Sequence, residues 1–143
     1  MSDPAVAAAG GDSGTIRDLV EIKLPAVSAY LSVLRTATAG LAARLDFTLD
    51  EIEDLRIAVD EACAMLLAQA DTHAGGDLTC TFELGSDSLD VAVSVPTVDP
   101  ALPDQDTFAW TVLTALAGEV SADYSGGRLR LTMHKKRSFA GSA

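Results

Sequence analysis

The chain lacks several of the features by which common classes of protein are recognised. It has only two cysteines, Cys63 and Cys80, too few for a disulfide framework and without the spacing of a metal site. We therefore expect two small buried thiols and no metal ligands. No apolar run reaches the roughly 18 residues of a membrane-spanning helix, and the first residues lack the basic and apolar segments of a secretory signal. These absences predict a cytoplasmic protein with no membrane partner.

Basic residues are also scarce, since 10 Lys and Arg stand against 21 Asp and Glu and give a formal net charge of −11. Binding to nucleic acid needs clustered cations, so the composition favours a protein partner over direct contact with nucleic acid. Residues 46–61 are densely acidic, with Arg56 as their one basic side chain. They form either a solvated helix face or an acidic docking surface for a basic partner, with Asp50, Glu53, Asp54 and Arg56 as its contacts.

The composition divides the chain into one domain and two tails. With 143 residues, of which 48% are hydrophobic, the chain is long enough to bury one core. Residues 1–15 are mainly Ala, Gly, Ser and Asp and have too few large apolar side chains to offset the entropy of ordering. We therefore expect residues 1–15 to be a disordered tail, residues 16–134 to be the domain and residues 135–143 to be a mobile tail.

Residues 48–70 predict a long helix around which the rest of the chain is arranged. Thr48 and Glu51 have the spacing of a capping box, which marks the start of the helix. Glu61 lies at the edge of the apolar stripe, beside the core, so it is either a reactive carboxylate or the partner of Arg56 or Arg128. The stripe is predicted from residues at three- and four-residue steps: Leu49, Ile52, Leu55, Val59, Ala62 and Leu66.

The remaining residues predict alternating strands and helices. Residues 17–24 alternate in polarity and predict a strand, and residues 26–45 predict a helix that packs antiparallel to the next one across a two-residue connection, Asp46 and Phe47. Two β-hairpins follow at residues 78–95 and 119–134. Between the hairpins, residues 96–106 are a proline-rich loop and residues 107–117 a helix with the apolar face Phe108, Val112, Leu113 and Leu116. This order predicts an α+β fold, a two-layer sandwich with helices on one face of a mostly antiparallel sheet.

The run LRIAVDEA at residues 55–62 resembles the bacterial anti-sigma factors that are also serine protein kinases, which have a histidine-kinase-like ATPase fold. The likeness extends from about residue 20 to residue 133 and includes the element order, the helix pair and the run TVLTALAGEV at residues 111–120. The resemblance implies ATP and Mg²⁺ as cofactors, a sigma factor and an anti-anti-sigma antagonist as protein partners, and a homodimer. In that family this helix carries a general-base Glu, matched by Glu61, and four residues later an Asn that holds Mg²⁺.

The chain departs from the family at three nucleotide-binding elements. Met65 stands at the position of the Asn, and a thioether is a poor ligand for Mg²⁺, which prefers oxygen. The adenine-pocket motif, an Asp followed by glycines, would fall at residues 95–99, where the chain has VPTVD, with Asp99 but no glycine. The glycine-rich phosphate loop would fall at residues 106–110, DTFAW, where two bulky aromatic residues would obstruct the approach of phosphate to the backbone.

Three functions are compatible with these observations. The first is an anti-sigma factor that sequesters a sigma factor, is released by an antagonist, and has weak or lost ATP binding and kinase activity. The second is an active kinase in which Glu61 activates a hydroxyl of the antagonist and ATP supplies the phosphoryl group. The third is a non-enzymatic α/β domain that shares only the fold. The first is our interpretation.

Overall fold

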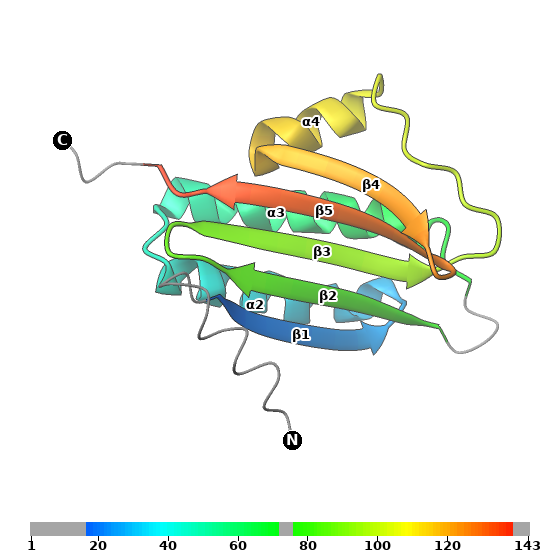
Figure 1. Cartoon of the computed structure of the whole chain (residues 1–143), viewed down its shortest axis with the longest axis horizontal. Coiled ribbons are helices and arrows are strands. Elements are labelled where there is room, and N and C mark those ends of the chain that lie inside the picture. The colour runs from blue at the N-terminus through cyan, green and yellow to red at the C-terminus, as the bar shows by residue number, and fades with distance from the viewer. Residues whose placement is uncertain (1–16, 72–75, 139–143) are drawn as a thin grey trace, which may run out of the picture.

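The computed structural model describes residues 17–71 and 76–138, which form a five-stranded sheet with helices on one face (Figure 1). The strand order is β1-β2-β3-β5-β4, and every pair of neighbours is antiparallel. The predicted α+β class and two-layer arrangement are confirmed, whereas the tail predicted at residues 1–15 lies outside the described residues. The elements are β1 (Asp18–Pro25), the 3-10 helix η1 (Ser28–Tyr30), α2 (Leu31–Arg44), α3 (Leu49–Leu67), β2 (Asp77–Leu84), β3 (Ser88–Pro96), α4 (Phe108–Ala117), β4 (Glu119–Ser125) and β5 (Arg128–Lys136).

The core lies between the sheet and the helices. In β2, β3 and β5, alternate side chains point towards the helices and are buried, as the two-residue period of a strand requires. Helix α3 contacts α2 and α4 as well as β3 and β5, so it lies in the middle of the helical layer. Its buried residues are Leu55, Ala58, Val59, Ala62, Cys63 and Leu66. Full burial of one such Leu or Val side chain contributes about 1.5–3 kcal/mol.

The chain turns from α2 into α3 through a tight corner. The N–H of Phe47 donates to Ala42 O at 3.1 Å and that of Asp46 to Ala43 O at 3.0 Å, the two bonds of a Schellman motif. Asp46 takes the left-handed conformation that this motif needs, with φ of 63°, and Phe47 turns into the core, where it is 6% exposed. The connection is short, as predicted, but it comprises the four residues 45–48 and not Asp46 and Phe47 alone. Helices α2 and α3 pack side by side (Figure 1).

Glycines occupy the turn of the second hairpin and the position where the chain passes from α4 into that hairpin. Gly126 and Gly127 have φ of 61° and 77°, which matches the left-handed pair of a tight hairpin turn between β4 and β5. Gly118, between α4 and β4, has φ of 91°, and a Cβ there would lie 2.8 Å from the carbonyl oxygen of His134. Glycine is thus required at this close approach of two backbones.

Several predicted boundaries and faces are wrong. The helix predicted from residue 26 begins at Leu31, because Val27 is extended and residues 28–30 form a 3-10 turn. Leu49 and Phe108, predicted on apolar faces, are 84% and 83% exposed. Each is the first residue of its helix, where the helical period does not reveal whether another element packs against the side chain. The fold also continues beyond residue 134, since β5 runs to Lys136 and Ser138 is hydrogen-bonded to α3.

Replacing Asp46 with glycine is expected to stabilise the protein by up to about 1 kcal/mol, because glycine adopts the left-handed conformation without steric cost. Chemical denaturation monitored by circular dichroism measures the free energy of unfolding. Asp46→Ala is the matched control and is expected to be less stable than the glycine variant. A glycine variant less stable than the wild type would show that the side chain of Asp46 stabilises the corner.

Candidate functional site

The first turn of α3 fixes the positions of the candidate residues that follow it. The Thr48 hydroxyl oxygen accepts a hydrogen bond from Glu51 N at 3.1 Å, and Glu51 Oε1 accepts one from Thr48 N at 2.8 Å. These are the two bonds of the predicted capping box, which is confirmed. Glu51 Oε2 also accepts a hydrogen bond from Ser138 N at 2.7 Å, so the segment just after the last strand is tied to the start of α3.

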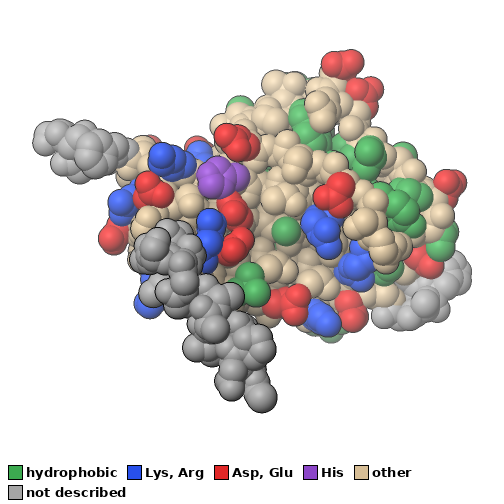
Figure 2. Space-filling model, viewed as in Figure 1, with side chains coloured by type: hydrophobic (Ala, Val, Ile, Leu, Met, Phe, Trp, Pro, Cys, Tyr) green, Lys and Arg blue, Asp and Glu red, His purple; other side chains and the backbone are tan. Residues whose placement is uncertain are grey.

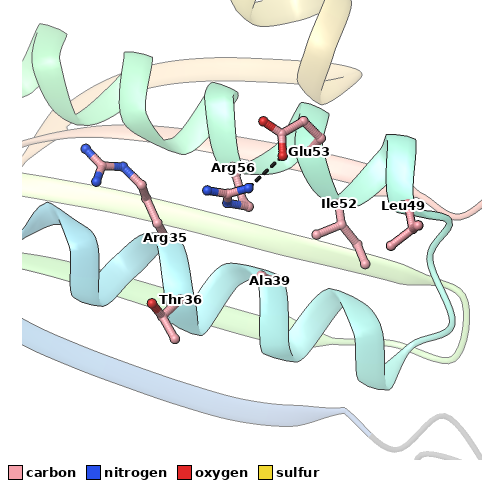
Figure 3. Close-up of a pocket in the computed structure, with 7 residues that line it drawn as sticks. All are labelled: Arg35, Thr36, Ala39, Leu49, Ile52, Glu53 and Arg56. Carbon is pink, nitrogen blue, oxygen red and sulfur yellow. Dashed lines mark hydrogen bonds and ion pairs between the residues drawn. The ribbon is translucent and has the colours of Figure 1, made fainter.

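A groove of about 410 Å³ separates the exposed sides of α2 and α3 (Figure 3). Two of the four predicted partner contacts, Glu53 and Arg56, line it, whereas Asp50 and Asp54 lie elsewhere on α3. The groove combines an apolar surface with charged walls, an arrangement suited to a side chain or helix of another protein. Its full lining is Arg35, Thr36, Ala39, Leu49, Ile52, Glu53 and Arg56.

Ion pairs change the charge expected of this surface. Arg56 Nη1 donates to Glu53 Oε1 at 2.6 Å, so one of the acidic groups expected to meet a basic partner is already paired within the chain. Arg35 Nε donates to both carboxylate oxygens of Asp60, at 2.9 and 2.7 Å. The groove wall therefore carries two arginines as well as a carboxylate.

Arg35 is a groove residue that the sequence did not suggest. It lies on α2, 25 positions from the Asp60 that holds it, so the pattern within α3 contains no sign of its position. The available signal was that Arg35 is the one basic residue between residues 24 and 43 and lies in the helix predicted beside α3.

Glu61, Met65 and Gln69 follow one another at four-residue steps and so lie in one row along α3 and its end. Glu61 is half-buried and, within residues 17–71 and 76–138, has no hydrogen bond or ion pair. The pairing considered for it is wrong, because Arg56 is held by Glu53 and Arg128 Nε donates to Ser94 Oγ at 3.0 Å. Glu61 is thus a partly exposed carboxylate that pairs with none of the residues that the structure describes.

Gln69 holds the loop that follows β3. Its Nε2 donates to Ala101 O at 2.8 Å, and its Oε1 accepts from Ala101 N at 2.8 Å. The loop is also fixed where it leaves the strand, since Thr97 N donates to Gly127 O at 3.1 Å and the Tyr124 hydroxyl donates to Thr97 O at 3.2 Å. Asp99, the residue considered for adenine binding, is exposed on this tethered loop.

The residues present do not fit the Mg²⁺ site that the resemblance implies. Met65 is partly buried and packs against the core, and its sulfur offers no oxygen ligand. Among residues 17–71 and 76–138, no group of three His, Cys, Asp or Glu side chains could hold a metal ion. At the start of α4 the Thr107 hydroxyl oxygen accepts a hydrogen bond from Trp110 N at 3.1 Å, so the chain itself satisfies an N–H that could otherwise face an anion.

The two cysteines have the buried positions predicted for them. Cys63 and Cys80 are both free and fully buried. Burial raises the pKa of the Cys63 thiol to about 12, and burial together with the neighbouring Cys63 raises that of Cys80 as well. Both thiols therefore stay protonated and unreactive at neutral pH.

The described helices include none long and apolar enough to cross a membrane.

The structure has a helix pair on an antiparallel sheet, with a glutamate in the capped central helix. This domain is similar to the serine-protein kinase type of anti-sigma factor, so the resemblance noted in the run LRIAVDEA is confirmed. No protein-family model matches the chain. Over 75 residues, the chain is 37% identical to the serine-protein kinase RsbW of Bacillus cereus (strain ATCC 10987 / NRS 248), covering 52% of this chain and 47% of the relative. RsbW of Bacillus mycoides (strain KBAB4) is 36% identical with the same coverage. The chain thus spans about half the length of the curated relatives it matches.

A solved structure supports the fold independently. The crystal structure of the RsbU and RsbW domains of Rv1364c from Mycobacterium tuberculosis matches 84% of this chain and 32% of that chain, with a TM-score of 0.65. The two sequences are 16% identical across this match, so the likeness is one of fold.

Lowering the pH is expected to release Ser138 from α3. Burial by itself would raise the pKa of Glu51, but the hydrogen bonds from Thr48 and Ser138 outweigh it and lower the pKa. The charged form therefore stabilises the fold at pH values above the unfolded pKa of about 4.3, and this contribution is lost as the pH falls through the lower folded pKa. Amide chemical shifts of Ser138 during an acid titration measure the release. Glu51→Gln should abolish this titration, and an unchanged profile in that variant would exclude Glu51 as its source.

Proposed function

We propose that the chain is an anti-sigma factor that sequesters a sigma factor by direct binding in the cytoplasm. An anti-anti-sigma antagonist releases the sigma factor by competing for the protein, and ATP binding and kinase activity are weak or lost. The observation that carries the proposal is the combination of an RsbW-like fold with Met65, packed against the core, at the position where the family holds its metal. The fold that makes the protein contacts is retained, whereas the oxygen ligand that would hold Mg²⁺ for phosphoryl transfer is replaced by the thioether of Met65.

The groove between α2 and α3 is the surface we assign to partner binding. Leu49 offers an apolar anchor that is 84% exposed at the first position of α3. Arg35 and Arg56 keep guanidinium nitrogens free after pairing with Asp60 and Glu53, so they can still bind a carboxylate of the partner. Asp50 and Asp54 lie on α3 outside the groove lining and are the contacts we propose for basic residues of the same partner.

The Leu49→Asp variant is expected to weaken sigma-factor binding at least about tenfold, because it removes an apolar contact worth about 1.5–3 kcal/mol when fully buried. Folding should be retained, since an acidic residue in the first turn of a helix is favourable. Isothermal titration calorimetry against candidate sigma factors measures the change.

Phe108→Asp is the matched control for Leu49→Asp, because Phe108 is 83% exposed and is also the first residue of its helix, α4. This control and Glu61→Gln should both bind with wild-type affinity. Equal loss of binding in Phe108→Asp would remove the groove from the proposal. Failure of the wild type to bind any sigma factor at low salt would remove the proposed function itself.

The nucleotide part of the proposal predicts little or no heat when ATP and Mg²⁺ are added to the protein, because Met65 supplies no oxygen ligand. Hydrogen exchange of residues 97–107 should also be unaffected by ATP, since the loop is already tethered by Gln69. Transfer of labelled phosphate from ATP to a serine of the antagonist, with loss of transfer in Glu61→Gln, would instead establish the active kinase. That outcome would leave sigma-factor binding as a separate activity.

A further inference from the structure

The sheet has a second face, opposite the helices, that no described element covers (Figures 1 and 2). Figure 2 shows basic side chains among acidic and uncharged ones on this face. A hollow of about 280 Å³, which we call the sheet hollow, crosses four neighbouring strands there, β1, β2, β3 and β5. Its volume is just below the roughly 300–1,000 Å³ of pockets for drug-sized ligands, so it suits a small chemical group.

The charge of the sheet hollow is opposite to that of the whole chain. Its lining includes Lys23, Arg128 and Arg130, whereas Glu21 is the one carboxylate among its described residues. Three positive charges against one negative give the lining a formal charge of +2, on a chain whose net charge is −11. A recess of positive charge raises the local concentration of anions, so the ligand that fits this hollow is an anion.

The strand register places two hydroxyl groups between two cations. Thr79 on β2 lies opposite Ser94 on β3, and both line the hollow. Lys23 on β1 lies opposite Thr79 on its other side, and Arg130 on β5 lies opposite Ser94. Neighbouring strands are about 4.8 Å apart, a distance that the long side chains of Lys and Arg can span. An anion above the two hydroxyls would therefore meet a cation on each side.

Arg128 leaves both of these hydroxyls free to donate. Its Nε donates to Ser94 Oγ at 3.0 Å, and its Nη2 donates to Thr79 Oγ1 at 3.3 Å. A hydroxyl that accepts a hydrogen bond keeps its own proton, and within residues 17–71 and 76–138 neither hydroxyl donates that proton to another group. Arg128 is itself held in place, since Nη2 also donates to Asp77 O at 2.8 Å and to Ser94 O at 3.0 Å.

The two flanking cations also have donors to spare. Lys23 has no hydrogen bond or ion pair with any residue that the structure describes. Arg130 Nη1 lies 3.6 Å from Asp123 Oδ1, which is longer than a hydrogen bond, so the N–H groups of Arg130 remain available. Apart from Glu21, the polar groups of the hollow thus present donors from several directions.

A phosphate group matches this set of donors better than a carboxylate does. It has at least three acceptor oxygens that point in different directions, whereas a carboxylate has two oxygens in one plane. We propose that the sheet hollow is a binding site for a phosphate group, held by Lys23, by Arg130 and by the two hydroxyls beside Arg128. The site lies on the opposite face of the sheet from the helices, so it is separate from the groove and does not rest on the proposed function.

Titration of the full chain with inorganic phosphate, followed by amide chemical shifts, tests the site. Ionic strength is held constant, because salt screens exposed charges. Saturable shifts are expected at Thr79 and Ser94, with a dissociation constant in the millimolar range. Lys23→Gln and Arg130→Gln should each raise this constant at least about threefold, as expected for the loss of one exposed charge contact. Lys136→Gln, which makes the same charge change at an exposed position of β5 outside the hollow, should leave it unchanged.

Glu21→Gln provides a test in the opposite direction. It removes the carboxylate of the lining and should lower the dissociation constant for phosphate, a result that damage to the fold would not produce. The absence of saturable shifts in the wild type would overturn the proposal. So would unchanged binding in both Lys23→Gln and Arg130→Gln, or acetate that binds as tightly as phosphate.

A phosphoserine peptide and its unphosphorylated form distinguish the sources of the phosphate group. They are titrated at a pH above the second pKa of a phosphate ester, about 6, so that the group is a dianion. Tighter binding of the phosphopeptide, weakened by Lys23→Gln, would assign the site to a modified protein. Tighter binding of inorganic phosphate would assign it to a free ion, and equal binding of the two peptides would exclude the modified protein.

Discussion

The structure depends on how the free backbone groups at the end of α2 and the start of α3 are satisfied within one short corner. A helix leaves unpaired carbonyls at its end and unpaired N–H groups at its start, and here the Schellman bonds and the capping box provide for both. The two residues that follow the last strand reach the same corner, because Arg137 Nη1 donates to Leu45 O at 3.2 Å and Ser138 N donates to Glu51. Segments far apart in the sequence thus fix the angle at which α2 and α3 meet and, with it, the shape of the groove.

The net charge of −11 does not describe the surface of the groove between α2 and α3. Glu53 lines the groove and is paired with Arg56, and Asp60 is paired with the groove residue Arg35, so the acidic run presents a mixed surface. Electrostatics at such surfaces serves the choice of partner and orientation more than affinity, because exposed ion pairs are individually weak.

Local chemistry made much of the fold predictable. The capping box at Thr48, the corner at Asp46 and Phe47, and the glycine turn of the second hairpin each depend on a few adjacent residues, and the structure has all of them. The exposure of Leu49 and Phe108 was not predictable in this way. Whether a helical side chain is buried depends on what lies opposite it, and periodicity within one helix does not contain that information.

The candidate site also has features that the local sequence predicts and features that it does not. The identities of Glu61 and Met65 and their four-residue spacing are visible in the sequence, and the structure adds that Met65 packs against the core. Arg35 of the groove and the tether at Gln69 involve partners 25 and 32 positions away in the sequence, so they appear only when the elements are assembled. Long-range pairs of this kind are the part of a site that local patterns cannot supply.

The tether between Gln69 and Ala101 has a consequence for how the sequence can vary. Both of its hydrogen bonds go to the backbone of Ala101, so the amide of Gln69 pairs with the loop as a neighbouring strand would and does not depend on the side chain it meets. Substitutions along the loop, proline at residue 101 excepted, leave those bonds intact. The loop between β3 and α4 can therefore acquire new side chains for new partners while its path over the end of α3 stays the same.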